Sequence, residues 1–165
     1  MESGAPLGVW RPQPFDPSET LEFVETEIGL PMKPLPTTAE LEKQLAECED
    51  RTIGERLRRK LRVVTTLGEG PISKQPAWVW KIGDTLLCAQ PNEPYSKFGT
   101  EVRNAFPDRS VMVCSMANGG FGYVYPSELG NENLYQVWQS PFESGLSELT
   151  DGVIDAARTM VETEK

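Results

Sequence analysis

Hydrophobic and polar positions follow two different periods along the chain, and the changes of period divide it into elements. Thr37 and Glu40 have the spacing of a helix-capping box, and apolar residues then recur every three to five positions as far as Val64. This spacing predicts a long amphipathic helix near the N-terminal third, with Gly54 as the place where it would break.

After Gly68 the period becomes strand-like. Residues 77–82 and 85–89 predict a β-hairpin around a Gly83-Asp84 turn. Four further elements are expected: a helix over 95–106, a strand over 110–116, a strand over 121–125 and a C-terminal helix over 146–160. This order predicts an α/β (α+β) fold, in which a mixed sheet with one hairpin packs in layers against helices.

The first 36 residues differ from the rest because they are rich in proline. We expect them to be a mostly extended lead-in that lies on the surface and docks on something else. Ser18 to Glu27 is acidic and can form one or two helix turns. The chain therefore divides into a lead-in, 1–36, and one folded part, 37–165.

Charge and hydropathy exclude several classes of partner. The 165 residues carry a formal net charge of −9, which repels phosphate backbones, so no nucleic-acid partner is expected. No apolar run approaches the roughly 18 residues of a membrane-spanning helix, so no transmembrane segment is expected. Residues 1–10 lack the basic start and apolar stretch of a secretory signal, and the compartment stays open.

The chain contains no histidine, which removes Ser-His-Asp and Cys-His catalysis and every imidazole-ligated metal site. Three cysteines, Cys48, Cys88 and Cys114, lack the paired spacing of a thiolate zinc site. We expect them to be reduced and mostly buried thiols.

Two segments can carry chemistry, and each also has a purely structural interpretation. Glu93 follows a strand and precedes a helix, where α/β folds place ligands, but the helix dipole alone also favours a carboxylate there. Residues 118–126 hold three glycines around an aromatic residue, which suits a close backbone approach or simply a tight turn. Neither segment alone identifies a function.

Together with their flanks, these segments resemble a known family. The motifs are Leu-Pro-Met-Lys-Pro-Leu-Pro at 30–36, Gln-Pro-Asn-Glu-Pro at 90–94, Ser-Met-Ala-Asn-Gly at 115–119, Gly-Tyr-Val at 122–124 and Leu-Tyr-Gln-Val at 134–137. In this order the chain, from about Leu30 to its end, resembles the carboxyl-terminal part of the catalytic domain of the neutral/alkaline, non-lysosomal ceramidases, above all the bacterial members.

The resemblance implies a zinc amidohydrolase that splits the N-acyl amide of ceramide-type lipids into a fatty acid and a sphingoid base. It aligns Glu93 and Tyr123 with two zinc ligands and Tyr135 with a tyrosine near the substrate head group. The sequence departs from the family at Asn92, where a glycine is usual, and at Gly120, where an aromatic residue is common.

The histidine ligands and a serine implicated in catalysis belong, in that family, to an amino-terminal portion that this sequence does not include. The resemblance therefore implies a portion of an enzyme that is inactive as an isolated chain. Its partners would be the N-acyl sphingoid substrate and the missing amino-terminal portion, or a separate subunit in its place.

A surface that meets such a partner should be apolar. Its candidates are Trp78, Trp80, Trp138 and Phe142, with ordinary core packing as the alternative for at least half of them. Two other functions stay open: a non-catalytic binding or subunit protein built on a retained fragment of this fold, and a small acidic interaction domain whose likeness to the family is accidental.

Overall fold

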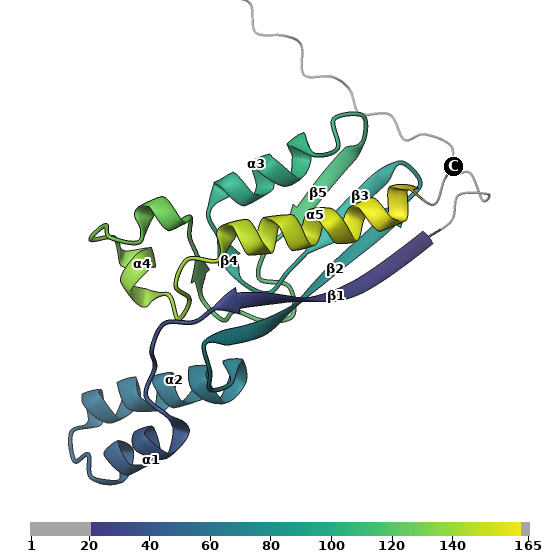
Figure 1. The fold of residues 1–165 in the computed structure, drawn as a ribbon. Coiled ribbons are helices and arrows are strands. Elements are labelled where there is room, and N and C mark those ends of the chain that lie inside the picture. Colours follow the sequence, from purple (N-terminus) through teal and green to yellow (C-terminus); the bar gives the residue numbers. More distant parts are fainter. Residues whose placement is uncertain (1–20, 163–165) are drawn as a thin grey trace, which may run out of the picture.

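The computed structural model describes residues 21–162, which form a sheet with helices packed on one of its faces (Figure 1). The main sheet consists of β1 (Leu21–Pro31), β2 (Ile72–Ile82), β3 (Thr85–Ala89) and β5 (Ser110–Cys114). The helices are α1 (Thr38–Ala46), α2 (Arg51–Leu67), α3 (Ser96–Asn104), α4 (Tyr135–Gln139) and α5 (Leu146–Glu162). A second, small sheet pairs β4 (Glu93–Pro94) with β6 (Tyr123–Val124), and a short 3₁₀ turn spans Ser127–Leu129.

The main sheet is mixed, as the sequence predicts. Its order is β1-β2-β3-β5, with β1 and β3 antiparallel to β2 and with β5 parallel to β3. The predicted hairpin is confirmed, because β2 and β3 meet at a turn in which Gly83 has φ of 56°, a value that glycine adopts without strain. Helix α3 makes the crossover that a parallel pair requires.

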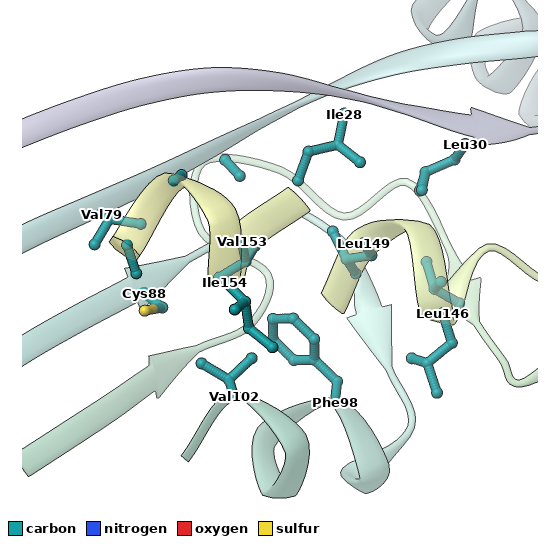
Figure 2. Close-up of a cluster of buried hydrophobic side chains, with 14 of the residues drawn as sticks. Ile28, Leu30, Val79, Cys88, Phe98, Val102, Leu146, Leu149, Val153 and Ile154 are labelled. Carbon is teal, nitrogen blue, oxygen red and sulfur yellow. The ribbon is translucent and has the colours of Figure 1, made fainter. Parts of the chain in front are cut away.

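The hydrophobic core lies between one face of this sheet and the helices α3 and α5 (Figure 2). Leu149 and Val153 of α5 are fully buried between Phe98 of α3 and the strands. Each fully buried side chain of this size contributes about 1.5–3 kcal/mol. At Gly152 a Cβ atom would lie 2.7 Å from Ile28, so this glycine lets α5 approach β1 closely.

The predicted long helix over residues 37–64 is wrong in one respect, because two helices occupy this region. The chain leaves the helical path between α1 and α2, where the carboxylate of Asp50 accepts hydrogen bonds from the backbone N–H of Thr52 at 2.8 Å and of Ile53 at 2.9 Å. An aspartate in this position favours a helix start over a helix interior. Gly54, where we expected a break, lies inside α2, whereas the capping box of Thr37 is confirmed.

The interpretation of residues 18–27 as helix turns is also wrong for the described part. Residues 21–31 form β1, an edge strand of the main sheet, while the rest of the lead-in before Leu21 lies outside the described residues. Val24, Ile28 and Leu30 recur on the core side with a period of two, and this alternation outweighs the helix-favouring acidic content.

The cysteines are free, but only Cys88 is buried, whereas Cys48 is partly buried and Cys114 is exposed. The expectation of mostly buried thiols is therefore wrong, because Cys114 lies on the side of β5 that faces away from the helices. Within residues 21–162, none of the helices combines the length and the apolar character needed to cross a bilayer.

Candidate functional site

Glu93 and Tyr123 lie side by side at the end of the main sheet, although thirty positions separate them in the sequence. The parallel pairing of β4 with β6 places them directly opposite each other. Two backbone hydrogen bonds hold this pair of strands, from Glu93 N to Gly122 O and from Tyr95 N to Val124 O, both at 3.0 Å. Glu93 thus lies at a junction between a strand and a helix, as the sequence predicted.

The buried side chain of Gln90 fixes the backbone that leads to Glu93. Its Oε1 accepts from the N–H of Asn92 at 2.7 Å, and its Nε2 donates to the carbonyl of Asn92 at 2.9 Å. The same carbonyl also accepts from Met116 N at 3.1 Å, which ties the segment to the loop after β5. A buried amide that satisfies two backbone groups holds this turn in one conformation.

Tyr123 is held from the other side by the segment that precedes α5. The hydroxyl of Ser140 donates to the carbonyl of Tyr123 at 2.6 Å and accepts from Phe142 N at 3.0 Å. Gly122 has φ of 141°, and a Cβ atom there would lie 2.6 Å from Cδ of Pro141. Only glycine fits at this contact, so the glycine-rich segment does provide a close backbone approach.

Three aromatic rings extend from Tyr123 along α4. The rings of Tyr123 and Tyr135 meet edge to face with centroids 6.0 Å apart, and those of Tyr135 and Trp138 do so at 5.0 Å. Tyr135 is 54% exposed and Trp138 is 59% exposed. Tyr135 and Trp138 are three positions apart on one helix, which places both on the same side of α4.

The environment of Tyr123 keeps its phenol protonated. Desolvation raises the pKa of Tyr123, and the negative charge of Glu93, the neighbouring Tyr135 and a hydrogen bond with Glu93 raise it further. The neutral phenol therefore donates a hydrogen bond to the Glu93 carboxylate. The two groups form a carboxylate–phenol pair at the edge of the aromatic array.

The structure thus brings together all three residues that the sequence singled out: Glu93, Tyr123 and Tyr135. Sequence reasoning missed the supporting roles of Gln90 and Ser140, although a polar residue directly after a buried strand is a signal for the first.

Asn92 is fully buried, and neither its Oδ1 nor its Nδ2 has a hydrogen-bond partner among the described residues. This is the position where the family resemblance expects glycine. Leaving a buried amide unpaired costs free energy, so this departure weakens the support of the turn before Glu93.

The donor atoms of the described residues supply only part of the ligand set that a catalytic zinc ion needs. Within residues 21–162 no group of three or more His, Cys, Asp or Glu side chains is placed to hold a metal ion. The carboxylate of Glu93 and the phenol of Tyr123 are two oxygen donors, whereas a catalytic zinc takes three protein ligands and an open position. The residues of this chain do not suffice for zinc on their own.

The aromatic residues expected on a partner-facing surface separate into three groups. Phe142 is fully buried in the core, so the alternative of ordinary core packing holds for it. Trp138 is exposed beside the site, and Trp78 and Trp80 are half-buried on the face of the main sheet that is turned away from α3 and α5.

Comparison with solved structures finds similarity to ceramidases. The neutral ceramidase from Pseudomonas aeruginosa is 15% identical with a TM-score of 0.48, over 86% of this chain and 29% of that chain. A structure described as a ceramidase complexed with C2 is 21% identical with a TM-score of 0.46, over 55% of this chain and 15% of that chain. The chain therefore spans less than a third of these structures. No family model matches the chain, and no curated protein matches it.

Proposed function

We propose that this chain supplies part of the active site of a zinc-dependent amidohydrolase that cleaves the N-acyl amide bond of ceramide-type lipids. One observation carries the proposal: the β4–β6 pairing sets Glu93 against Tyr123, and Tyr135 packs on the ring of Tyr123. The ordered motifs that resemble the neutral ceramidases supply the reaction class.

In this proposal each residue has one role. Glu93 offers a hard carboxylate oxygen to the metal, and Tyr123 offers either a second oxygen ligand or a hydrogen bond to an oxyanion that develops on the amide carbonyl. Tyr135 and Trp138 present apolar rings with polar tips, which suits the head group of an amphipathic lipid. Zinc, when bound, would lower the pKa of a water molecule and polarise the carbonyl.

The chain alone is proposed to be inactive. Two oxygen donors without histidine hold zinc weakly, so another polypeptide segment has to contribute the remaining ligands.

A zinc titration followed by NMR of tyrosine-labelled protein tests the ligand assignment. We expect Zn²⁺ to shift the ring signals of Tyr123 in a saturable manner, and we expect Glu93→Gln to weaken this effect by about tenfold or more, which corresponds to 1.4 kcal/mol. Tyr95→Phe serves as the control because Tyr95 contributes only backbone contacts to the paired strands. Zinc that leaves Tyr123 unperturbed, or binds equally well after Glu93→Gln, would contradict the assignment.

A chimera tests the reaction. The segment of the Pseudomonas aeruginosa neutral ceramidase that aligns with this chain is replaced by this chain, and hydrolysis of a fluorescent ceramide is measured. Activity that Glu93→Gln or Tyr123→Phe removes and Tyr95→Phe preserves would support the proposal. A folded chimera that binds zinc but does not cleave ceramide would contradict it.

A non-catalytic binding or subunit protein is the second candidate. The apolar face of the main sheet that no layer of residues 21–162 covers favours it, because such a face is typical of a protein that functions in an assembly. An inactive chimera together with a stable complex through that face would select this candidate.

A further inference from the structure

One whole face of the main sheet lacks a covering layer among the described residues. Helices α3 and α5 pack on the opposite face, which holds the core (Figure 1). We call the uncovered side the open sheet face. It is lined by Leu21, Phe23, Ile72, Trp78, Trp80, Ile82, Leu87 and Met112.

The strand registers align these side chains in rows that cross the sheet. One row runs from Phe23 through Trp80 and Leu87 to Met112, one apolar residue from each strand. The rings of Phe23 and Trp80 touch with centroids 5.3 Å apart. Phe23 is 52% exposed and Met112 is 58% exposed, so an apolar stripe reaches both edges of the sheet.

The strand directions make an uncovered face unusual. Parallel strands are nearly always covered on both faces, whereas the described residues cover the parallel pair of β3 and β5 on one face only. An apolar face of this kind, with a parallel pair at one side, normally packs against a second layer about 10 Å away.

We propose that the open sheet face binds the same face of a second copy of this chain, around a two-fold axis parallel to the strands. Such an axis places β2 of one copy over β3 of the other copy and β1 over β5. The proposal concerns a surface apart from Glu93 and Tyr123, and it does not rest on the amidohydrolase proposal.

The axis also decides which rows of the two copies meet. The two tryptophans of β2, Trp78 and Trp80, are in register with Ala89 and Leu87 of β3 within one copy. Rotation about the two-fold axis reverses the order of the strands but keeps each row at its position along them. Each row of one copy therefore meets the same row of the second copy. Each Trp78 thus lies over the row of Ala89 of the second copy, in which Ala89 itself is buried, and each Trp80 lies over the partly buried Leu87, so apolar rows meet apolar rows.

Charge favours the same arrangement. The outward-facing carboxylates, Glu25 and Glu27, both lie on β1, and Lys74 of β2 pairs with Glu27 at 3.2 Å. Stacking β1 over β1 would bring the carboxylates of two copies together. Stacking β1 over β5 instead places Glu25 opposite Cys114, which lies in the same row, and leaves Glu27 beyond the end of β5, so like charges stay at opposite edges.

The available area is compatible with a specific dimer. Five large apolar residues of this face are more than half exposed: Leu21, Phe23, Ile72, Ile82 and Met112. Phe23, the one aromatic residue of the five, buries about 150–250 Å² when covered fully, and the five half-exposed side chains together offer on the order of 500 Å². Trp78, Trp80 and Leu87 add to this, which brings the face near the roughly 800 Å² that each partner buries in a specific interface.

Sedimentation of the full chain tests the proposal. We expect a dimer of the 18.4 kDa chain, and we expect Trp80→Lys or Met112→Lys to weaken dimerisation by about tenfold or more. Trp138→Lys is the control, because Trp138 is an exposed tryptophan outside the open sheet face. Far-UV circular dichroism reports whether each variant keeps its fold, and the two face variants lie on different strands.

Cross-linking tests the axis itself. In a Cys48→Ser background, Glu25→Cys places a thiol opposite Cys114 of the second copy, and a short bismaleimide should then give a covalent dimer that Cys114 alone does not give. A monomer at all concentrations overturns the proposal and leaves the face to a different polypeptide. A dimer that Trp80→Lys and Met112→Lys leave intact also overturns it.

Discussion

At the residue scale, two buried amides two positions apart make opposite contributions to stability. Gln90 satisfies both polar atoms of its amide, whereas neither polar atom of Asn92 has a partner among the described residues. Since an unpaired buried polar group costs about 1–3 kcal/mol, Asn92→Leu, which keeps the branched shape, should leave stability unchanged or raise it by about 1 kcal/mol. Chemical denaturation measures the difference.

Gln90→Met is the matched variant for this prediction. It keeps the length of the side chain but removes both hydrogen bonds to the backbone of Asn92, so it should destabilise the protein by about 1–3 kcal/mol. If Asn92→Leu is destabilising by a similar amount, the amide of Asn92 has a partner such as a buried water molecule.

The cysteines permit a second prediction at this scale. Burial raises the pKa of Cys88 from 9.0 to about 11, whereas Cys114 is exposed. A thiol-specific reagent at neutral pH should therefore modify Cys114 promptly and Cys88 only after unfolding. Peptide mass mapping of modified and Cys114→Ser protein distinguishes the two sites, and rapid modification of Cys88 in the folded protein would contradict the prediction.

The raised pKa also fixes the sign of a pH effect on stability. The folded state binds the Cys88 proton more tightly than the unfolded state. This contribution to stability is fully present below pH 9.0 and is lost as the pH rises through about 11. Cys88→Ala should therefore lose less stability than the wild type between these pH values.

At the element scale, the helices α1 and α2 form an insertion between two paired strands. Pro31 is the register partner of Ile72, and Met32 N donates to Pro71 O at 2.8 Å, so the two strands are already joined at the base of the insertion. The helix pair projects from the end of the sheet (Figure 1). In the last turn of α2, Leu67 reaches the core.

Replacing residues 34–69 with Asn-Gly should therefore leave the main sheet folded. This dipeptide favours the type I′ turn that closes a two-residue hairpin. We expect the helical signal in circular dichroism to fall, while the NMR shifts of Val79 and Cys88 in the core stay near their wild-type values. Global loss of those shifts would mean that the helix pair is required for the sheet to fold.

The sequence predicted best those elements that depend on local signals. Helix α5 and the hairpin of β2 and β3 follow from periodicity and one turn, and both were predicted. The break before α2 depends on Asp50 forming a cap, and the strand β1 depends on its pairing with β2. Caps compete weakly with helix propensity, and long-range strand pairing leaves little local signal, so both were missed.

At the scale of the whole molecule, the family resemblance identified residues whose proximity no periodicity predicts. Glu93 and Tyr123 meet through a parallel pairing of only two residues on each strand, which leaves no pattern in the sequence. The open sheet face was anticipated in part through Trp78 and Trp80, but its extent became visible only with the strand registers. Registers depend on contacts between distant segments, which is why the sequence could not separate the buried Phe142 from the tryptophans of this face.

The net charge of the chain opposes its self-association. Each copy carries −9, so two copies repel one another at long range while the open sheet face attracts at short range. Added salt shortens the Debye length to about 8 Å at physiological ionic strength and reduces the repulsion, whereas apolar burial is not weakened. The dimer dissociation constant measured by sedimentation should therefore fall as salt rises from low to physiological concentration. A basic partner on this face would show the opposite trend, because salt would screen an attraction, so the direction of the salt effect also distinguishes a second copy from such a partner.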